Sequence, residues 1–221
     1  MSAFFLNELG IACALGRDVD GVATALFADD APHGVAMSDA ITGRPTSLGL
    51  VPGELPSLDD LPVELRGRNN QLLRIALASL RASVAAAVGK YGSDRVAVVL
   101  GSSTSGVGES EAAHRHFLAT GTWPETFHYR QQEMGTPALF VAAELGLRGP
   151  AHVISTACSS SAKAMASAAR LLKAGMADAV VTGGADSLCR FTVAGFGALG
   201  SVSQQRCNPF SLNRNGINIG E

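Results

Sequence analysis

The sequence predicts an α/β fold built around a mostly parallel sheet, and three observations lead to this prediction. Short, continuous apolar runs end at glycine or polar residues, as strands buried on both faces of a sheet do. Segments of helical length lie between these runs, and this alternation favours parallel strands joined by right-handed crossovers. Glycine is abundant, at 25 of 221 residues, and aromatic residues make up only 5%, which suits closely packed layers.

The strands are predicted in chain order from their apolar residues. Residues 4–15 are apolar and punctuated by Gly10 and Gly16, so we expect a first strand and its turn there. Three further apolar runs are expected to be buried strands, at residues 95–100, 152–155 and 179–182. Residues 34–62 are rich in glycine and proline and are predicted to be loop. Residues 208–221 are expected to be a loop entering a strand.

Five segments are predicted to be helical. They span residues 18–27, 70–88, 110–118, 137–145 and 159–174. Residues 70–88 show apolar side chains near helical spacing and are followed by Gly89 and Gly92 at the exit. Residues 159–174 are rich in alanine and serine nearly all round, so this helix is expected to be buried on most sides.

Composition and charge exclude several classes of protein. The chain carries 17 basic and 19 acidic residues, a net charge of −2, so no electrostatic footprint favours nucleic acid or an anionic membrane. No apolar stretch approaches the roughly 18 residues of a membrane span, and the N-terminus lacks the basic start of a signal peptide. The four cysteines form no Cys-x-x-Cys pair, which argues against zinc, thioredoxin-type and disulfide-framework proteins. We expect a reduced, cytoplasmic protein.

Cys158 is the residue whose position points to chemistry. It follows the predicted strand at 152–155 and precedes the helix at 159–174. A helix N-terminus offers free N–H groups and the positive end of the helix dipole, which favour a thiolate. A sharp strand-to-helix turn also exposes a nucleophile. A small buried core cysteine is the alternative.

Other motifs do not support a reactive site. Ser159, Ser160 and Ser161 lack the Gly-x-Ser-x-Gly frame and are expected to cap the helix or to pack. Residues 101–106 lack both the lysine of a phosphate-binding P-loop and the Gly-x-Gly-x-x-Gly of a dinucleotide fold. His114 and His116 are two residues apart and do not share a helix face, so we expect surface residues. No metal or organic cofactor is implied.

The segment Ser155-Thr156-Ala157-Cys158-Ser159-Ser160-Ser161 resembles the active site of the β-ketoacyl-[acyl carrier protein] synthases. These are the thiolase-fold condensing enzymes of fatty acid and polyketide synthesis. Further segments resemble the family in the same order, at residues 10–16, 101–106, 147–150, 177–186 and 195–199, followed by Ser203. The resemblance implies the N-terminal half of a thiolase-like layered αβαβα fold, with a mostly parallel mixed sheet and a buried nucleophile helix. Residues 1–221 are then a ketoacyl-synthase N-terminal domain that stops before the C-terminal half.

The resemblance also assigns roles to five residues. Cys158 matches the nucleophile that accepts the acyl chain as a thioester, and its backbone N–H is one of two donors to the oxyanion. Thr104 and Phe196 match positions that line the acyl pocket. His128 and Gln132 fall in the segment that reaches the partner subunit's pocket. For the last four residues, ordinary loop or core packing is the alternative.

The implied reaction is a decarboxylative, Claisen-type condensation of an acyl thioester with a malonyl-[acyl carrier protein]. The implied partners are acyl carrier protein and a second synthase chain, as a homodimer or a heterodimer. The family's decarboxylation histidines belong to the second half, and the five histidines here, at 33, 114, 116, 128 and 152, do not match them. We therefore expect that the chain alone does not condense.

Two segments depart from the family pattern, and other functions stay open. The family's Arg-Pro-Phe-Asp and Arg-Asp-Gly-Phe are replaced by Asn208-Pro209-Phe210-Ser211 and Arg214-Asn215-Gly216-Ile217. A non-catalytic, chain-length-type partner subunit is the alternative function, although such partners usually replace the nucleophile. A degradative thiolase is a third possibility, which residues 101–106 and 208–220 disfavour.

Overall fold

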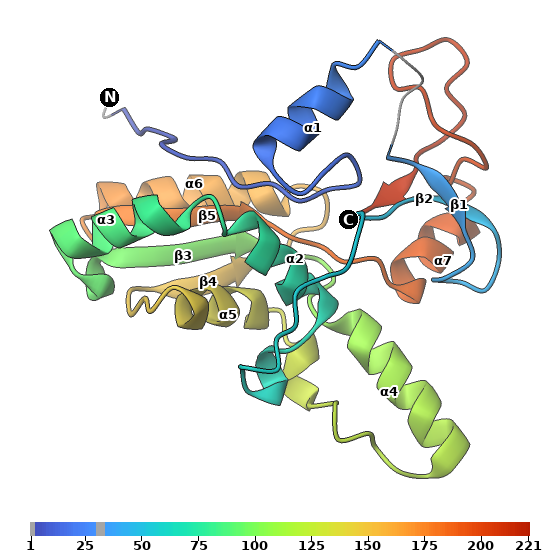
Figure 1. Ribbon diagram of the computed structural model, residues 1–221, viewed down its shortest axis with the longest axis horizontal. Helices are drawn as coiled ribbons and strands as arrows, with labels where there is room; N and C mark the ends of the chain where they lie inside the picture. The colour runs from blue at the N-terminus through green and yellow to red at the C-terminus, as the bar shows by residue number, and fades with distance from the viewer. Residues whose placement is uncertain (1–2, 30–33) are drawn as a thin grey trace.

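The computed structural model describes residues 3–29 and 34–221, and a parallel three-stranded sheet lies at its centre (Figure 1). The strand order is β4-β3-β5, with β3 (Val96–Gly101) between β4 (Ala151–Ile154) and β5 (Ala179–Gly184). All six residues of β3 are buried, as the apolar run predicts. The three predicted buried strands are therefore confirmed, with bounds that differ by one or two residues.

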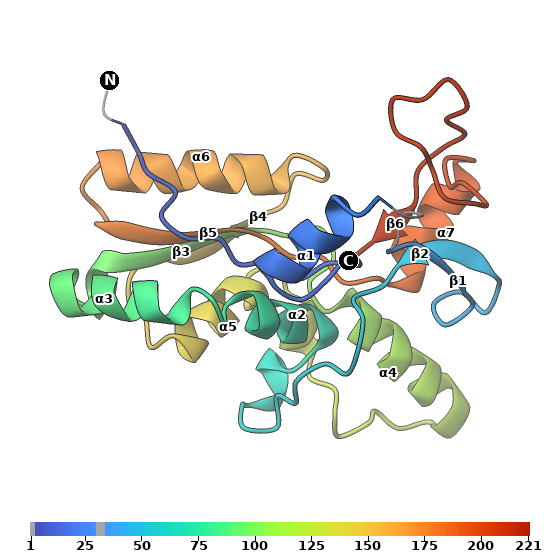
Figure 2. The same cartoon turned by 45° about the horizontal axis from the view of Figure 1, so that its top comes forward.

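Helices cover both faces of this sheet and make three layers (Figure 2). Helix α6 (Ser160–Lys173) lies on one face, and α3 (Arg81–Tyr91) and α5 (Thr136–Glu144) lie on the other. The side chains of β3 contribute to two separate cores, one on each face of the sheet, because successive side chains of a strand point to opposite faces. Val98 packs in the core that contains Phe140 of α5, whereas Val99 packs against Ala164 of α6. The predicted α/β class and mostly parallel sheet are confirmed.

A second, smaller sheet lies beside the C-terminal end of the first. Its order is β1-β2-β6, with β1 (Ala36–Ser38) antiparallel and β6 (Ile219–Gly220) parallel to β2 (Thr46–Gly49). The remaining elements are α1 (Val19–Leu26), η1 (Val63–Leu65), α2 (Arg68–Ala76), η2 (Ser93–Arg95), α4 (Val107–Thr120), η3 (Tyr129–Gln132) and α7 (Arg190–Ala198). The prediction that residues 34–62 are all loop is wrong, because β1 and β2 form there through pairing with each other and with β6.

The prediction of a strand at residues 4–15 is also wrong. No strand of the described residues pairs with this segment, which runs along the α2–α3 junction instead. Its carbonyl at Leu9 accepts a hydrogen bond from the Ser79 hydroxyl, and Cys13 and Gly16 close a tight turn. Gly10 lies so close to α2 that a Cβ there would be 2.0 Å from the carbonyl oxygen of Ala76. Only Gly10 approaches the helix this closely, and the apolar side chains of Phe5, Leu6 and Leu9 are exposed within the described chain.

The helix predicted at residues 70–88 is two helices. Helices α2 and α3 meet at an angle of 78°, and the break falls between Ala76 and Arg81. Leu77 is buried at the bend and packs in the main core, so tertiary packing overrides the helical periodicity. Among the described residues, no single helix is long and apolar enough to cross a membrane. Helices α2 and α3 together have that length and composition, but only as this bent pair.

Helix α6 buries one face within this chain. Ser160, Ala164 and Ala168 are buried, one turn apart, and their small side chains bring the helix close to β3 and β5. Other positions, including Met165 at 45% exposure, face outward. The prediction that this helix is buried on most sides is therefore wrong for the described residues, because the sheet covers only one of its faces.

Candidate active site

Cys158 lies in a sharp turn between β4 and α6. It is exposed, whereas Cys189 and Cys207 are buried and Cys13 is half-buried. The preceding residue, Ala157, has φ = 54°, in the left-handed region that costs a non-glycine residue roughly 1–2 kcal/mol. Such a conformation persists only where the surrounding structure enforces it. The turn therefore presents the thiol at the end of the strand and two residues before the first residue of α6.

Hydroxyl groups hold this turn in shape. The Ser160 hydroxyl accepts a hydrogen bond from the Thr156 N–H at 2.9 Å and donates one to the Ala157 carbonyl at 2.7 Å. The Ser159 hydroxyl donates to the Thr156 carbonyl at 2.9 Å. Ser160 is also buried beneath the turn. These two serines are structural, as the absence of a nucleophile motif around them predicts.

Two glycines bring the first turn of α6 against the sheet. A Cβ on Gly101 would lie 2.6 Å from the backbone of Ser160 and Ser161. A Cβ on Gly184 would lie 2.2 Å from the Ser161 hydroxyl. The first N–H groups of a helix have no partner within it and carry the positive end of its dipole. The ends of β3 and β5 thus fix that positive end next to the Cys158 turn.

The loop after β3 carries Thr104 and contacts the segment that carries Gln132. Thr104 is 5% exposed, and its hydroxyl donates to Asp186 at 2.8 Å. The Ser105 hydroxyl donates to the carbonyl of Glu133 at 2.8 Å, immediately after Gln132. Gln132 itself accepts a hydrogen bond from the Ser110 hydroxyl. The structure therefore brings the segments of Thr104 and Gln132 together.

His128 and Phe196 have no hydrogen bond to the Cys158 turn in the part of the chain that the structure describes. His128 is exposed, and its Nδ1 accepts a hydrogen bond from the Arg130 N–H at 3.2 Å, at the start of η3. Phe196 is half-buried on α7. The roles assigned to Thr104, Gln132, His128 and Phe196 remain predictions.

The other histidines lie away from the turn or outside the description. His114 is exposed and tilted against Trp123, and His116 is exposed, so the prediction of surface residues is confirmed. The ring of His152 lies 3.2 Å from the Ser167 hydroxyl. His33 lies outside the described residues.

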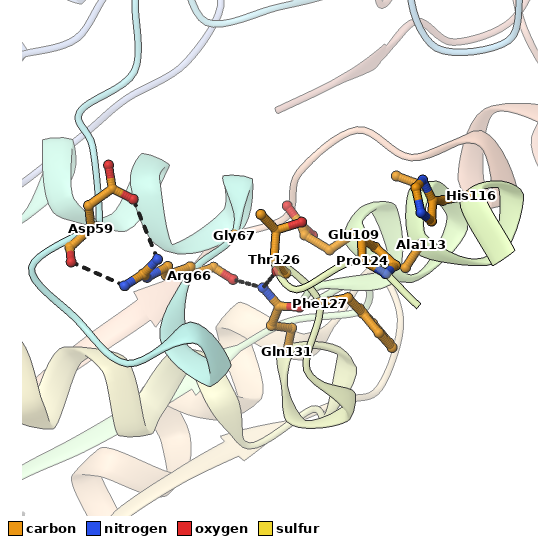
Figure 3. A pocket seen from close by; sticks show the side chains of 11 residues that line it. Asp59, Arg66, Gly67, Glu109, Ala113, His116, Pro124, Thr126, Phe127 and Gln131 are labelled. Carbon is orange, nitrogen blue, oxygen red and sulfur yellow. Dashed lines mark hydrogen bonds and ion pairs between the residues drawn. The ribbon is translucent and has the colours of Figure 1, made fainter. Parts of the chain in front are cut away.

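A cavity of about 430 Å³ lies between α4, the start of α2 and the segment before η3 (Figure 3). None of the five predicted site residues lines it. Two of its polar side chains already have partners: Arg66 pairs with Asp59, and the Gln131 amide donates to the backbone carbonyl of Arg66 at 2.8 Å. Cys158 lies at the open strand-to-helix turn and does not line this cavity.

An ion pair between Arg68 and the buried carboxylate of Glu221 holds the residue that follows β6. The Glu221 side chain is 0% exposed and accepts hydrogen bonds from the Arg68 guanidinium and from the N–H groups of Val51 and Leu188. The hydrogen bond to Glu221 raises the pKa of Arg68 above its ordinary value. This carboxylate joins the small sheet, α2 and the segment before α7 into one unit.

Asp186 holds the loop after β3, and the sequence alone does not single it out for this role. Its carboxylate accepts hydrogen bonds from the loop after β3, including the Thr104 hydroxyl. The available signal was an acidic residue two positions after Gly183-Gly184, at the end of a buried strand. That signal places Asp186 at the correct edge of the sheet but does not identify its partners.

Comparison with known proteins supports the fold. The family model described as beta-ketoacyl synthase, N-terminal domain, matches residues 72–221. Nodulation protein E of Rhizobium meliloti is 30% identical over 227 residues, which covers 98% of this chain and 55% of that protein. The 3-oxoacyl-[acyl-carrier-protein] synthase 2 of Staphylococcus aureus is 27% identical, with the same 98% of this chain and 56% of its own length covered. The chain thus spans about half the length of the curated relatives it matches.

Solved structures agree with these relatives. A structure of a ketosynthase in complex with its chain length factor from Xenorhabdus doucetiae matches with a TM-score of 0.85 and 40% identity, covering 96% of this chain and 54% of that one. A beta-ketoacyl synthase from Burkholderia phymatum STM815 matches with a TM-score of 0.76 and 23% identity, covering 96% and 55%. The predicted thiolase-like fold class is confirmed.

Proposed function

Because this chain belongs to the beta-ketoacyl synthase family, we propose that it accepts an acyl chain on Cys158 as the first step of a decarboxylative condensation. The single observation that carries this proposal is the exposed Cys158 thiol on a strained turn at the N-terminus of α6. We also propose that residues 1–221 form the N-terminal domain of a condensing enzyme.

The acylation step is a thioester exchange. The Cys158 thiolate attacks the carbonyl carbon of an acyl thioester, a new C–S bond forms, and the carbonyl electrons move to oxygen. Collapse of this intermediate breaks the C–S bond to the donor thiolate, which leaves and takes up a proton. The Cys158 backbone N–H is one donor to the oxyanion, and removing one such donor typically costs about 3–4 kcal/mol. Covalent catalysis of this kind divides one difficult step into two.

The second step needs groups over the malonyl carboxylate and thioester oxygen. Decarboxylation releases carbon dioxide and leaves a carbanion, which attacks the acyl carbon and expels the Cys158 thiolate. Of the described histidines, none hydrogen-bonds to the Cys158 turn, and Lys163 points outward from α6. We therefore propose that this 221-residue chain takes up the acyl group without condensing it.

The proposed partners are acyl carrier protein, as the acyl donor, and a related synthase chain. Strand β4 forms an edge of the central sheet, so its outer backbone groups are available to a second chain. The 40%-identical solved relative is a ketosynthase in complex with its chain length factor. Because that complex contains a chain length factor, a chain-length-type partner subunit is the second candidate function for this chain. The presence of Cys158 favours the catalytic function over this second one.

Mass spectrometry tests the proposal. The purified protein is offered acyl and malonyl thioesters of acyl carrier protein, and covalent adducts and carbon dioxide are measured together. We expect one acyl adduct on Cys158, none in Cys158→Ala, and an unchanged adduct in the control Cys189→Ala. A protein without any adduct contradicts the acyl-transfer function, and carbon dioxide release at the rate of full-length synthases contradicts the proposed lack of condensation. A stable monomer in light scattering would contradict the proposed association with a second synthase chain.

A further inference from the structure

One oxygen of Asp186 collects four hydrogen bonds from three consecutive residues. Its Oδ1 accepts from the Ser102 hydroxyl at 3.0 Å, the Ser103 N–H at 2.7 Å, the Thr104 N–H at 2.9 Å and the Thr104 hydroxyl at 2.8 Å. Hydrogen bonds to an ionised acceptor are roughly twice as strong as neutral ones. A single side chain thus fixes both the backbone and the hydroxyl groups of the loop that leaves β3.

The same loop is held on its far side by the segment that carries Gln132. Ser105 has φ = 42°, and its N–H donates to the Ser102 hydroxyl at 3.0 Å. The Ser105 hydroxyl donates to the Glu133 carbonyl, and a Cβ on Gly106 would lie 2.1 Å from the Gln131 carbonyl oxygen. Movement of the loop would therefore move the segment around Gln132 with it.

Asp186 also lies at the edge of the sheet where the Cys158 turn begins. The Ala185 N–H donates to the Gly101 carbonyl at 3.1 Å, and the Ser102 N–H donates to the Ile154 carbonyl at 3.3 Å. These bonds join the carboxyl ends of β3, β4 and β5. The Asp186 carboxylate consequently holds the loop at the same edge that presents the thiol.

We propose that Asp186 is a positioning residue for acyl transfer: through the 102–105 loop it sets the place of Thr104 on the wall of the acyl pocket. This inference rests on the proposed acylation of Cys158. Asp186 acts on the wall that contacts the acyl chain and not on the reacting atoms. Its loss should alter which chain lengths are accepted more than it alters the thiol's intrinsic reaction.

The experiment measures single-turnover acylation of Cys158 by acetyl, hexanoyl and decanoyl pantetheine thioesters in the intact protein, with adducts quantified by mass. In Asp186→Asn we expect the ratio of decanoyl to acetyl rates to change about tenfold, because small displacements of a positioned group have effects of that order. The rate with acetyl thioester should stay within about threefold of the unchanged protein. The matched control is Asp178→Asn, at the opposite end of β5, where the carboxylate pairs with Arg95 on the surface.

A second pair of variants keeps the inference testable if Asp186→Asn does not fold. Ser102→Ala removes one hydroxyl donor to Asp186 and leaves Thr104 in place, whereas Ser103→Ala changes an exposed side chain whose residue bonds to Asp186 only through its N–H. We expect Ser102→Ala to shift the chain-length ratio in the same direction as Asp186→Asn, and Ser103→Ala to leave the ratio unchanged. An adduct on Cys158 with an unchanged ratio, or an equal slowing of all three donors, overturns the role of Asp186 alone. A complete lack of Cys158 adduct in the unchanged protein overturns acyl transfer and this role together.

Discussion

Replacing Gly101 by alanine should displace the N-terminus of α6 and with it the Cys158 turn. The added Cβ would lie 2.6 Å from the carbonyl carbon of Ser160 and from the N atom of Ser161. Both atoms are backbone, so no side-chain rotation relieves the contact. Restoring an ordinary separation requires the helix to recede by about 0.8 Å, and such overpacking typically costs about 1–3 kcal/mol of stability.

The displacement should also slow the chemistry of Cys158. A shift of about 1 Å in a reacting group can cost a hundredfold in rate, so we expect acylation to fall at least tenfold. Urea unfolding measures the free energy of unfolding, and intact-mass kinetics with an acyl thioester measures the rate. Both measurements are made on the same preparation, so a loss of rate can be compared with a loss of folded protein.

The control for Gly101→Ala is Gly89→Ala. Gly89 lies in α3, and a Cβ there would meet no atom within 4 Å. Alanine in a helix interior is more favourable than glycine by about 1 kcal/mol, so this variant should be equally or more stable, with unchanged acylation. If Gly101→Ala matches Gly89→Ala in both stability and rate, close packing of α6 on the sheet does not control the site.

Three further outcomes are expected. In the folded protein, Cys158 should react with iodoacetamide faster than the other three cysteines, as peptide mapping would show, because it alone is exposed. Glu221→Gln should lower the free energy of unfolding by about 1–3 kcal/mol in urea titrations, since Arg68 loses its buried charged partner but is itself one-third exposed. The hydrogen bond from Arg74 lowers the pKa of Asp60, so the stability that this pair contributes is present above about pH 4 and is lost as the pH falls through the lowered pKa. Asp60→Asn should therefore unfold with a weaker dependence on acid, and an unchanged acid dependence would contradict this pairing.

The central sheet could be predicted from the sequence because its signals are local. The β3 strand is a continuous apolar run with all six residues buried, and such a run identifies a strand without knowledge of its neighbours. The alternation of strands and helices predicts parallel crossovers, but it does not select the observed order β4-β3-β5. The position of Cys158 at a strand-to-helix junction could also be predicted from its neighbouring residues alone.

The errors fall where non-local contacts decide the structure. Strand β2 pairs with β6, and its Leu48 lies opposite Ile219, from the other end of the chain. Residues 4–15 pair with no strand among the described residues, and the side chains of Phe5 and Leu6 stay exposed there. The partners of Asp186 are more than 80 residues away along the chain, so no short motif could identify them.

Different contacts within this chain hold the Cys158 turn and the residues proposed to line acyl pockets. The acceptor turn of Cys158 is held by bonds within this chain, from the Ser160 hydroxyl and the close approach of Gly101. The residues proposed to line acyl pockets lie on different elements: Thr104 is tied to the sheet edge by Asp186, whereas His128, in the segment proposed to reach the partner subunit's pocket, caps its own short helix. Acceptance of an acyl group should therefore depend mainly on the contacts that hold the Cys158 turn, and selection of its length on how Asp186 holds the loop of Thr104. A variant that changes length selection without changing the rate with the shortest donor would reveal that separation directly.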